Sequence, residues 1–145
     1  MLTITRAPSD VIAEVRAFYA EVGYGGGVAE SDITLVARLA GRLVGVVRLC
    51  AESDVVVLRG MHVHAAHQRQ GLGQQLLEHC GPYLNRGPTY CLPYQHLAEF
   101  YMHAGFEVAE PGQLPSFLAE RLARYISSAQ KVLAMQRIPN KPATS

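Results

Sequence analysis

The chain has 145 residues, of which 49% are hydrophobic, so we expect one globular domain rather than a disordered chain. Its 13 basic and 12 acidic residues give a net charge of +1, which argues against nucleic acid as a partner because nucleic-acid binders usually carry a basic excess. No apolar run approaches the ~18 residues of a membrane span, and no signal-peptide pattern is present. The three cysteines are an odd number and read as free thiols in a reducing compartment. The sequence therefore predicts a cytoplasmic protein without a membrane partner.

The first half of the chain reads as a short strand, one helix and three longer strands. Leu2 to Arg6 alternates between apolar and polar residues, as a strand does. Ser9-Asp10 is a candidate cap for a helix that ends at the glycines from Gly23. The three strands that follow are expected at residues 33–40, 43–50 and 55–63, with tight turns at Gly41-Arg42 and Ser53-Asp54. Consecutive strands joined in this way predict an antiparallel meander.

Helices and strands alternate in the second half. A helix with one apolar face is disrupted at Gly81-Pro82, and a shorter helix over residues 97–104 is closed by Gly105. A third helix starts at Pro115. Short strands are expected at residues 89–92, 106–109 and 132–138. The order predicts one α+β domain over residues 1–138, with a mixed, mostly antiparallel sheet flanked by helices, and a polar tail over 139–145.

The segment from Gln68 to Gly73 carries the clearest chemical signal. A strand ends, a polar link follows, and a helix opens on Gly71 and Gly73. Unpaired N–H groups and the positive end of the helix dipole favour a phosphate or pyrophosphate there, and glycine lets the anion approach the main chain. A dinucleotide site would need a third glycine where Leu76 stands, and a P-loop would need Lys-Ser/Thr after Gly71.

Gln68-x-x-Gly71-x-Gly73, after the strand residues Met61-x-Val63, resembles the pyrophosphate loop of the GCN5-related N-acetyltransferase (GNAT) superfamily. The block from Phe100-Tyr101 to Gly105-Phe106 resembles a second motif of that family. The resemblance implies an N-acetyltransferase that moves an acetyl group from acetyl-CoA, or an acyl group from a longer acyl-CoA, to a primary amine of a small molecule or peptide. It also implies central strands splayed at a bulge near Gly60. The implied cofactor-binding residues are Met61, Val63, Gln68, Arg69, Gln70, Gly71, Leu72 and Gly73.

The resemblance also implies that Tyr101 is the general acid that protonates the leaving thiolate, while Phe100 is expected to be the core aromatic of the same helix. His62 is the candidate base, as a neutral imidazole beside the bulge. His62, His64 and His67 could also be three ligands of a zinc site. No fourth Cys or His stands at ligand spacing, so we expect no metal.

Three features depart from the family pattern. Residues 55–63 and 89–94 contain no carboxylate that could be the base, Tyr94 stands where many members have Asn, and the segment that forms the acceptor lid in relatives is reduced to Gly23–Ser31. The alternative is therefore a non-catalytic acyl-CoA-binding or partner-binding module on the same fold. The last helix and strand, expected to be exposed, are candidates for pairing in a homodimer.

Overall fold

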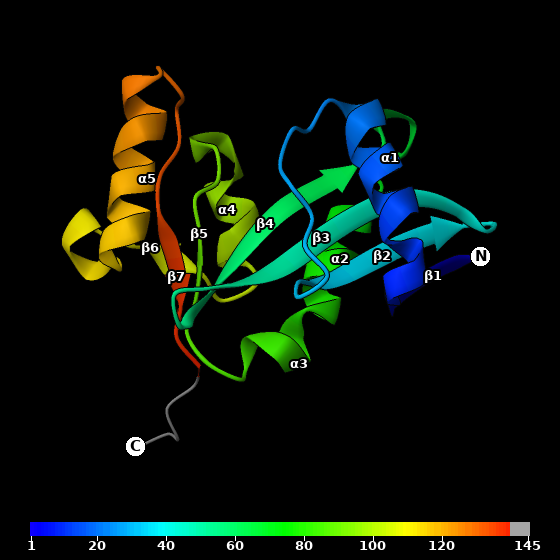
Figure 1. The fold of residues 1–145 in the computed structure, drawn as a ribbon, viewed down its shortest axis with the longest axis horizontal. Coiled ribbons are helices and arrows are strands. Elements are labelled where there is room, and N and C mark those ends of the chain that lie inside the picture. The colour runs from blue at the N-terminus through cyan, green and yellow to red at the C-terminus, as the bar shows by residue number, and fades with distance from the viewer. Residues whose placement is uncertain (140–145) are drawn as a thin grey trace. The chain divides into compact units, whose positions relative to one another are not determined.

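The computed structural model describes residues 1–139 and contains two compact units, Met1–Tyr83 and the part that begins at Leu84 (Figure 1). The predicted tail lies, apart from Pro139, outside the described residues, and one domain over residues 1–138 stays a prediction. The elements of the first unit are β1 (Leu2–Arg6), a 3-10 turn (Ser9–Val11), α1 (Ile12–Val22), β2 (Ile33–Leu39), β3 (Arg42–Glu52), β4 (Val55–Val63), a second 3-10 turn (Ala65–His67), α2 (Leu72–His79) and the start of α3 (Gly81–Leu84).

Strands β1 to β4 pair in chain order, and each described pairing is antiparallel, so the predicted meander is confirmed. The β2–β3 hairpin turns at Ala40 and Gly41, one residue before the expected Gly41-Arg42, because Arg42 already belongs to β3. The β3–β4 hairpin turns at Ser53 and Asp54 as expected, and all four turn residues have positive φ. Two successive positive φ values match the right-handed twist of hairpin strands. The predicted helix cap at Ser9-Asp10 is wrong, because these residues form a 3-10 turn ahead of α1 with no side-chain cap.

Two helices cover opposite faces of this sheet. Val15, Phe18 and Tyr19 of α1 pack on Val36 and Val46, on the side nearer the viewer in Figure 1. On the other face, Leu76 of α2 is fully buried. A Cβ at Gly45 would lie 3.0 Å from Leu76 Cδ1, so glycine in β3 lets α2 approach closely.

Strand β4 carries a bulge in its second half. The β3–β4 register runs from Val46↔His62 to Arg48↔Arg59, so Gly60 and Met61 together face a single residue of β3. Gly60 has φ +66°, a conformation that glycine adopts at little cost. The bulge that the sequence predicted near Gly60 is therefore confirmed, and it gives a new direction to the strand residues that lead into the Gln68–Gly73 loop.

The second unit has a three-stranded antiparallel arrangement in the order β5-β7-β6. Its elements are β5 (Thr89–Cys91), a 3-10 turn (Gln95–Leu97), α4 (Ala98–Met102), β6 (Glu107–Val108), a 3-10 turn (Pro111–Gln113), α5 (Ser116–Ser127) and β7 (Met135–Arg137). Arg137 links this unit internally, since its guanidinium donates to the Ala104, Leu84 and Asn85 oxygens at 3.0 to 3.1 Å.

The last strand is not exposed, which corrects the expectation from sequence. β7 pairs on one side with β5 and on the other with β6, and its residue Met135 is fully buried. Ile126 at the end of α5 is 54% exposed, and pairing of two chains through this helix stays a prediction. Among the helices of residues 1–139, none is long and apolar enough to cross a membrane.

Candidate active site

The Gln68–Gly73 loop meets α2 at a left-handed residue. Gly71 precedes the first turn of the helix with φ +80°, and a Cβ built there would meet nothing within 4 Å. The glycine is thus needed for its backbone conformation rather than for packing space. The N–H groups of the first helical turn have no partner within the helix and lie at the positive end of its dipole. This main-chain cradle suits the two phosphate groups of a pyrophosphate.

The side chains of the Gln68–Gly73 loop differ in their contacts and in their exposure. Gln68 Nε2 donates to the Val63 carbonyl at 3.0 Å, which ties the loop back to the end of β4. Leu72 is buried against the sheet, so only its main chain is available to a ligand. Arg69 and Gln70 are exposed, and Arg69 has φ +65°. The structure therefore brings the predicted residues from Met61 to Gly73 together along β4, the loop and the first turn of α2.

His62 lies just after the bulge on β4 and is half-buried. Its ring lies 4.8 Å from the Tyr24 ring and 6.1 Å from the Tyr19 ring, measured between centroids. Burial disfavours the charged imidazolium and lowers the pKa of His62 below its ordinary 6.5. A neutral imidazole at neutral pH can accept a proton, which is the state that a general base needs.

The lowered pKa of His62 gives an expected pH dependence of stability. In the unfolded chain this imidazole takes up its proton near pH 6.5, whereas the folded protein binds it only at lower pH. The unfolded state therefore binds more protons as the pH falls through 6.5, and the free energy of unfolding decreases. His62→Gln should lose less stability than wild type between about pH 7.5 and pH 5 in urea titrations. An equal loss of unfolding free energy in the two proteins would contradict the lowered pKa of His62.

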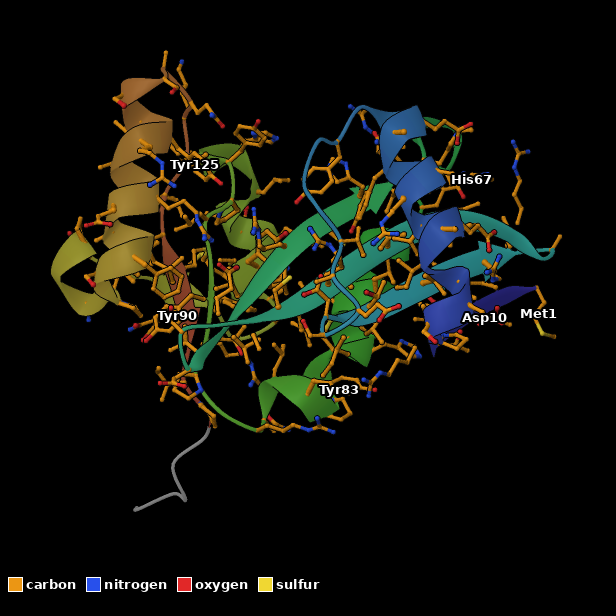
Figure 2. All side chains as sticks on the ribbon, in the orientation of Figure 1. Met1, Asp10, His67, Tyr83, Tyr90 and Tyr125 are labelled. Carbon is orange, nitrogen blue, oxygen red and sulfur yellow. The ribbon has the colours of Figure 1, made fainter. Side chains whose placement is uncertain are left out.

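The histidines do not assemble into a metal site in the described part of the chain. His64 Nε2 lies 3.7 Å from a Glu21 carboxylate oxygen, and His64 Nδ1 accepts a hydrogen bond from the Ala66 N–H at 3.2 Å. His67, labelled in Figure 2, lies in the 3-10 turn beyond the end of β4. Within residues 1–139 no group of three His, Cys, Asp or Glu side chains is placed to hold a metal ion.

Tyr101 belongs to the second unit, in the short helix α4. Its side chain is only 4% exposed, and its ring meets the rings of Phe100 and Phe106 edge-on at 5.0 and 5.8 Å. Phe100 is partly exposed, so the expectation that it is the core aromatic of this helix is wrong. Sequence spacing separates the two faces of a short helix but does not say which face the rest of the unit covers.

A buried arginine and its three polar partners, two of which have rings near His62, were not identified from the sequence. Arg48 on β3 is 2% exposed and lies among Tyr19, Tyr24 and Asp32. In the sequence, Arg48 follows two apolar residues and precedes three more, which is a signal that its position is buried. The three partners lie 16 to 29 residues away, and nothing in the sequence pattern relates them to it.

Comparison with known proteins matches this fold and loop to one family. The model of the acetyltransferase (GNAT) domain matches residues 30–108, which contain β2 to β4, the Gln68–Gly73 loop and Tyr101. A search of curated protein sequences found no match.

Solved structures with this fold are similar along nearly the whole chain. An acetyltransferase of the GNAT family from Streptococcus pneumoniae has a TM-score of 0.73 and 18% identity, over 97% of this chain and 100% of that one. The ribosomal-protein-S18-alanine N-acetyltransferase from Escherichia coli has a TM-score of 0.70 and 16% identity, over 100% and 99%. N-acetylglutamate synthase from Neisseria gonorrhoeae, complexed with coenzyme A and N-acetyl-glutamate, has a TM-score of 0.70 and 20% identity; the match covers 97% of this chain but only 36% of that one. These likenesses confirm the predicted α+β fold with a mostly antiparallel sheet flanked by helices.

Proposed function

Because the chain belongs to the GNAT acetyltransferase family, we propose that it transfers an acetyl group from acetyl-CoA directly to a primary amine of a small molecule or peptide. The observation that carries this proposal is the main-chain cradle at the start of α2, where Gly71 has φ +80° and its surroundings are open. A cradle of this kind suits the pyrophosphate of coenzyme A. The similar synthase from Neisseria gonorrhoeae, which is complexed with coenzyme A, supports the choice of ligand.

In the proposed reaction the amine first loses a proton, because an ammonium of lysine type has a pKa of about 10 and cannot attack. His62, neutral at physiological pH, takes that proton directly or through water. The amine nitrogen then bonds to the thioester carbonyl carbon, and main-chain N–H groups near Val63 stabilise the charge on the carbonyl oxygen. The carbon–sulfur bond breaks, and Tyr101 donates its proton to the departing thiolate. The nitrogen of the new amide gives up its surplus proton, which returns to the Tyr101 phenolate directly or through water. The products are an amide and free coenzyme A.

A screen of amines tests this function directly. The protein is incubated with acetyl-CoA and a panel of amino acids, polyamines and peptides with free N-termini or lysines, and the release of free thiol is followed. At least one amine should release thiol faster than buffer alone. Acetyl-CoA should also raise the melting temperature, since it binds the native state, whereas NAD should not. A shift with NAD and none with acetyl-CoA would overturn the family-based choice of ligand.

A non-catalytic acyl-CoA-binding or partner-binding module is the second candidate. It is favoured by the lack of any carboxylate in residues 55–63 and 89–94, which leaves the weakly basic His62 as the base. The same screen separates the two functions. A thermal shift with acetyl-CoA and no thiol release with any amine would support the binding module.

A further inference from the structure

Arg48 is a buried charge in the first unit. Its side chain on β3 is 2% exposed, and its Nη1 lies 2.8 Å from an Asp32 carboxylate oxygen that is itself 7% exposed. Removing a guanidinium and a carboxylate from water costs several kcal/mol per ion, and apolar residues of similar volume often serve stability equally well. Stability alone therefore does not account for this pair.

The guanidinium on β3 bonds at the same time to α1 and to two residues of the segment between α1 and β2. Nε donates to the Tyr19 hydroxyl of α1 at 3.3 Å, and Nη2 donates to the Tyr24 hydroxyl at 3.1 Å. Nη1 donates to Asp32, and the same carboxylate oxygen accepts the Ala29 N–H at 3.0 Å. Tyr24 and Asp32 lie near the two ends of the segment between α1 and β2, so Arg48 fastens that segment to the sheet at both ends.

One branch of this network ends at the bulge of β4. The Tyr19 hydroxyl, oriented by Arg48 Nε, donates to the Gly60 carbonyl at 2.8 Å. A Cβ at Gly60 would collide with the Tyr19 hydroxyl and lie 3.2 Å from Arg48 Nε. Gly60 is thus required both by its φ of +66° and by this close approach. The network fixes the point at which the strand turns toward Met61–Val63.

The other branch ends at His62. The Tyr24 ring is held at its hydroxyl by Arg48 and packs against two other rings, with centroid distances of 4.6 Å to Tyr19 and 4.8 Å to His62. Because one aromatic neighbour of His62 is held by a buried charge, the imidazole is kept in one position relative to the bulge.

We propose that Arg48 is the positioning residue of the acceptor side: through Tyr24 it fixes the His62 ring, and through Tyr19 it fixes the bulge at Gly60. Because Arg48 is 2% exposed, its proposed effect is exerted through these side chains rather than by contact with a substrate. This inference rests on the proposed acetyl transfer for its effect on turnover, whereas its effect on the His62 ring is independent of any activity.

Arg48→Lys tests the proposal, because an ammonium can keep the charge opposite Asp32 but cannot reproduce the fork that reaches both tyrosines. With the best amine of the panel, the acceptor KM should rise about tenfold or more, while affinity for acetyl-CoA stays within a few-fold. The matched control is Arg38→Lys in β2, where the arginine pairs with Glu14 at a solvent-exposed position. It should leave both values unchanged.

Tyr24→Phe provides the second variant, since it removes one hydroxyl and keeps the ring. The NMR signals of the His62 imidazole should move in Tyr24→Phe and in Arg48→Lys but not in Arg38→Lys. Unmoved His62 signals in Tyr24→Phe would overturn the proposal, and so would an Arg48→Lys protein with a lower melting temperature but wild-type acceptor KM. If the signals move and no amine releases thiol from wild type, the proposed function fails and the acceptor role of Arg48 fails with it, while the structural link to His62 stands.

Discussion

Gly71→Glu should weaken acetyl-CoA binding by at least about tenfold, equivalent to about 1.4 kcal/mol. Two effects act together. The left-handed backbone of Gly71, at φ +80°, is strained for any residue with a side chain, and a carboxylate at the start of α2 repels the pyrophosphate that the helix terminus attracts. Since a Cβ here meets no atom within 4 Å, the variant should still fold. Calorimetry with acetyl-CoA gives the affinity.

Gly71→Gln is the matched control, because glutamine has the size of glutamate and the same backbone strain but no charge. The difference between the two variants isolates the electrostatic part of the effect, which should shrink as salt is added. Unchanged affinity in a folded Gly71→Glu protein would rule out this loop as the acetyl-CoA site.

The parts of the fold that were predicted from sequence are those with local causes. The turn at Ser53 and Asp54 lies between two strongly apolar strands, and β4 was located with its observed bounds, Val55–Val63. Gly60 within that strand indicated the bulge, since a glycine inside a strand weakens it unless the backbone needs positive φ. In each case the cause lies within a few residues of its effect.

The parts that were missed depend on contacts between distant residues. A single arginine among apolar residues is predicted to be buried, but its partners cannot be predicted from the local sequence. Two of them, Asp32 and Tyr24, come from a glycine-rich segment that reads as a mobile loop. The exposure expected for β7 was wrong for a similar reason. Strand β7 is a central strand and not an edge strand because it pairs with both β5 and β6. Both of these strands lie much earlier in the sequence, so the local pattern around β7 does not reveal the pairing.

Tyr101→Phe should lower kcat about 10- to 1000-fold, the usual span for losing one general acid. A phenol, whose pKa in water is about 10, stays protonated at neutral pH and can donate as the thiolate departs. The loss should therefore appear in kcat more than in acetyl-CoA affinity, which should stay within a few-fold. Phenylalanine keeps the edge-on ring contacts with Phe100 and Phe106, so the variant should fold.

Phe100→Leu is the control for packing in the same helix. Phe100 is partly exposed, so this change should cost no more than about 1 kcal/mol of unfolding free energy and should have little effect on kcat. Pre-steady-state measurement of thiol release shows whether chemistry limits turnover. If it does, and Tyr101→Phe still turns over as fast as wild type, Tyr101 is not the acid. The phenol would then be a core residue of α4, and the thiolate would have to take its proton from water or leave as the anion.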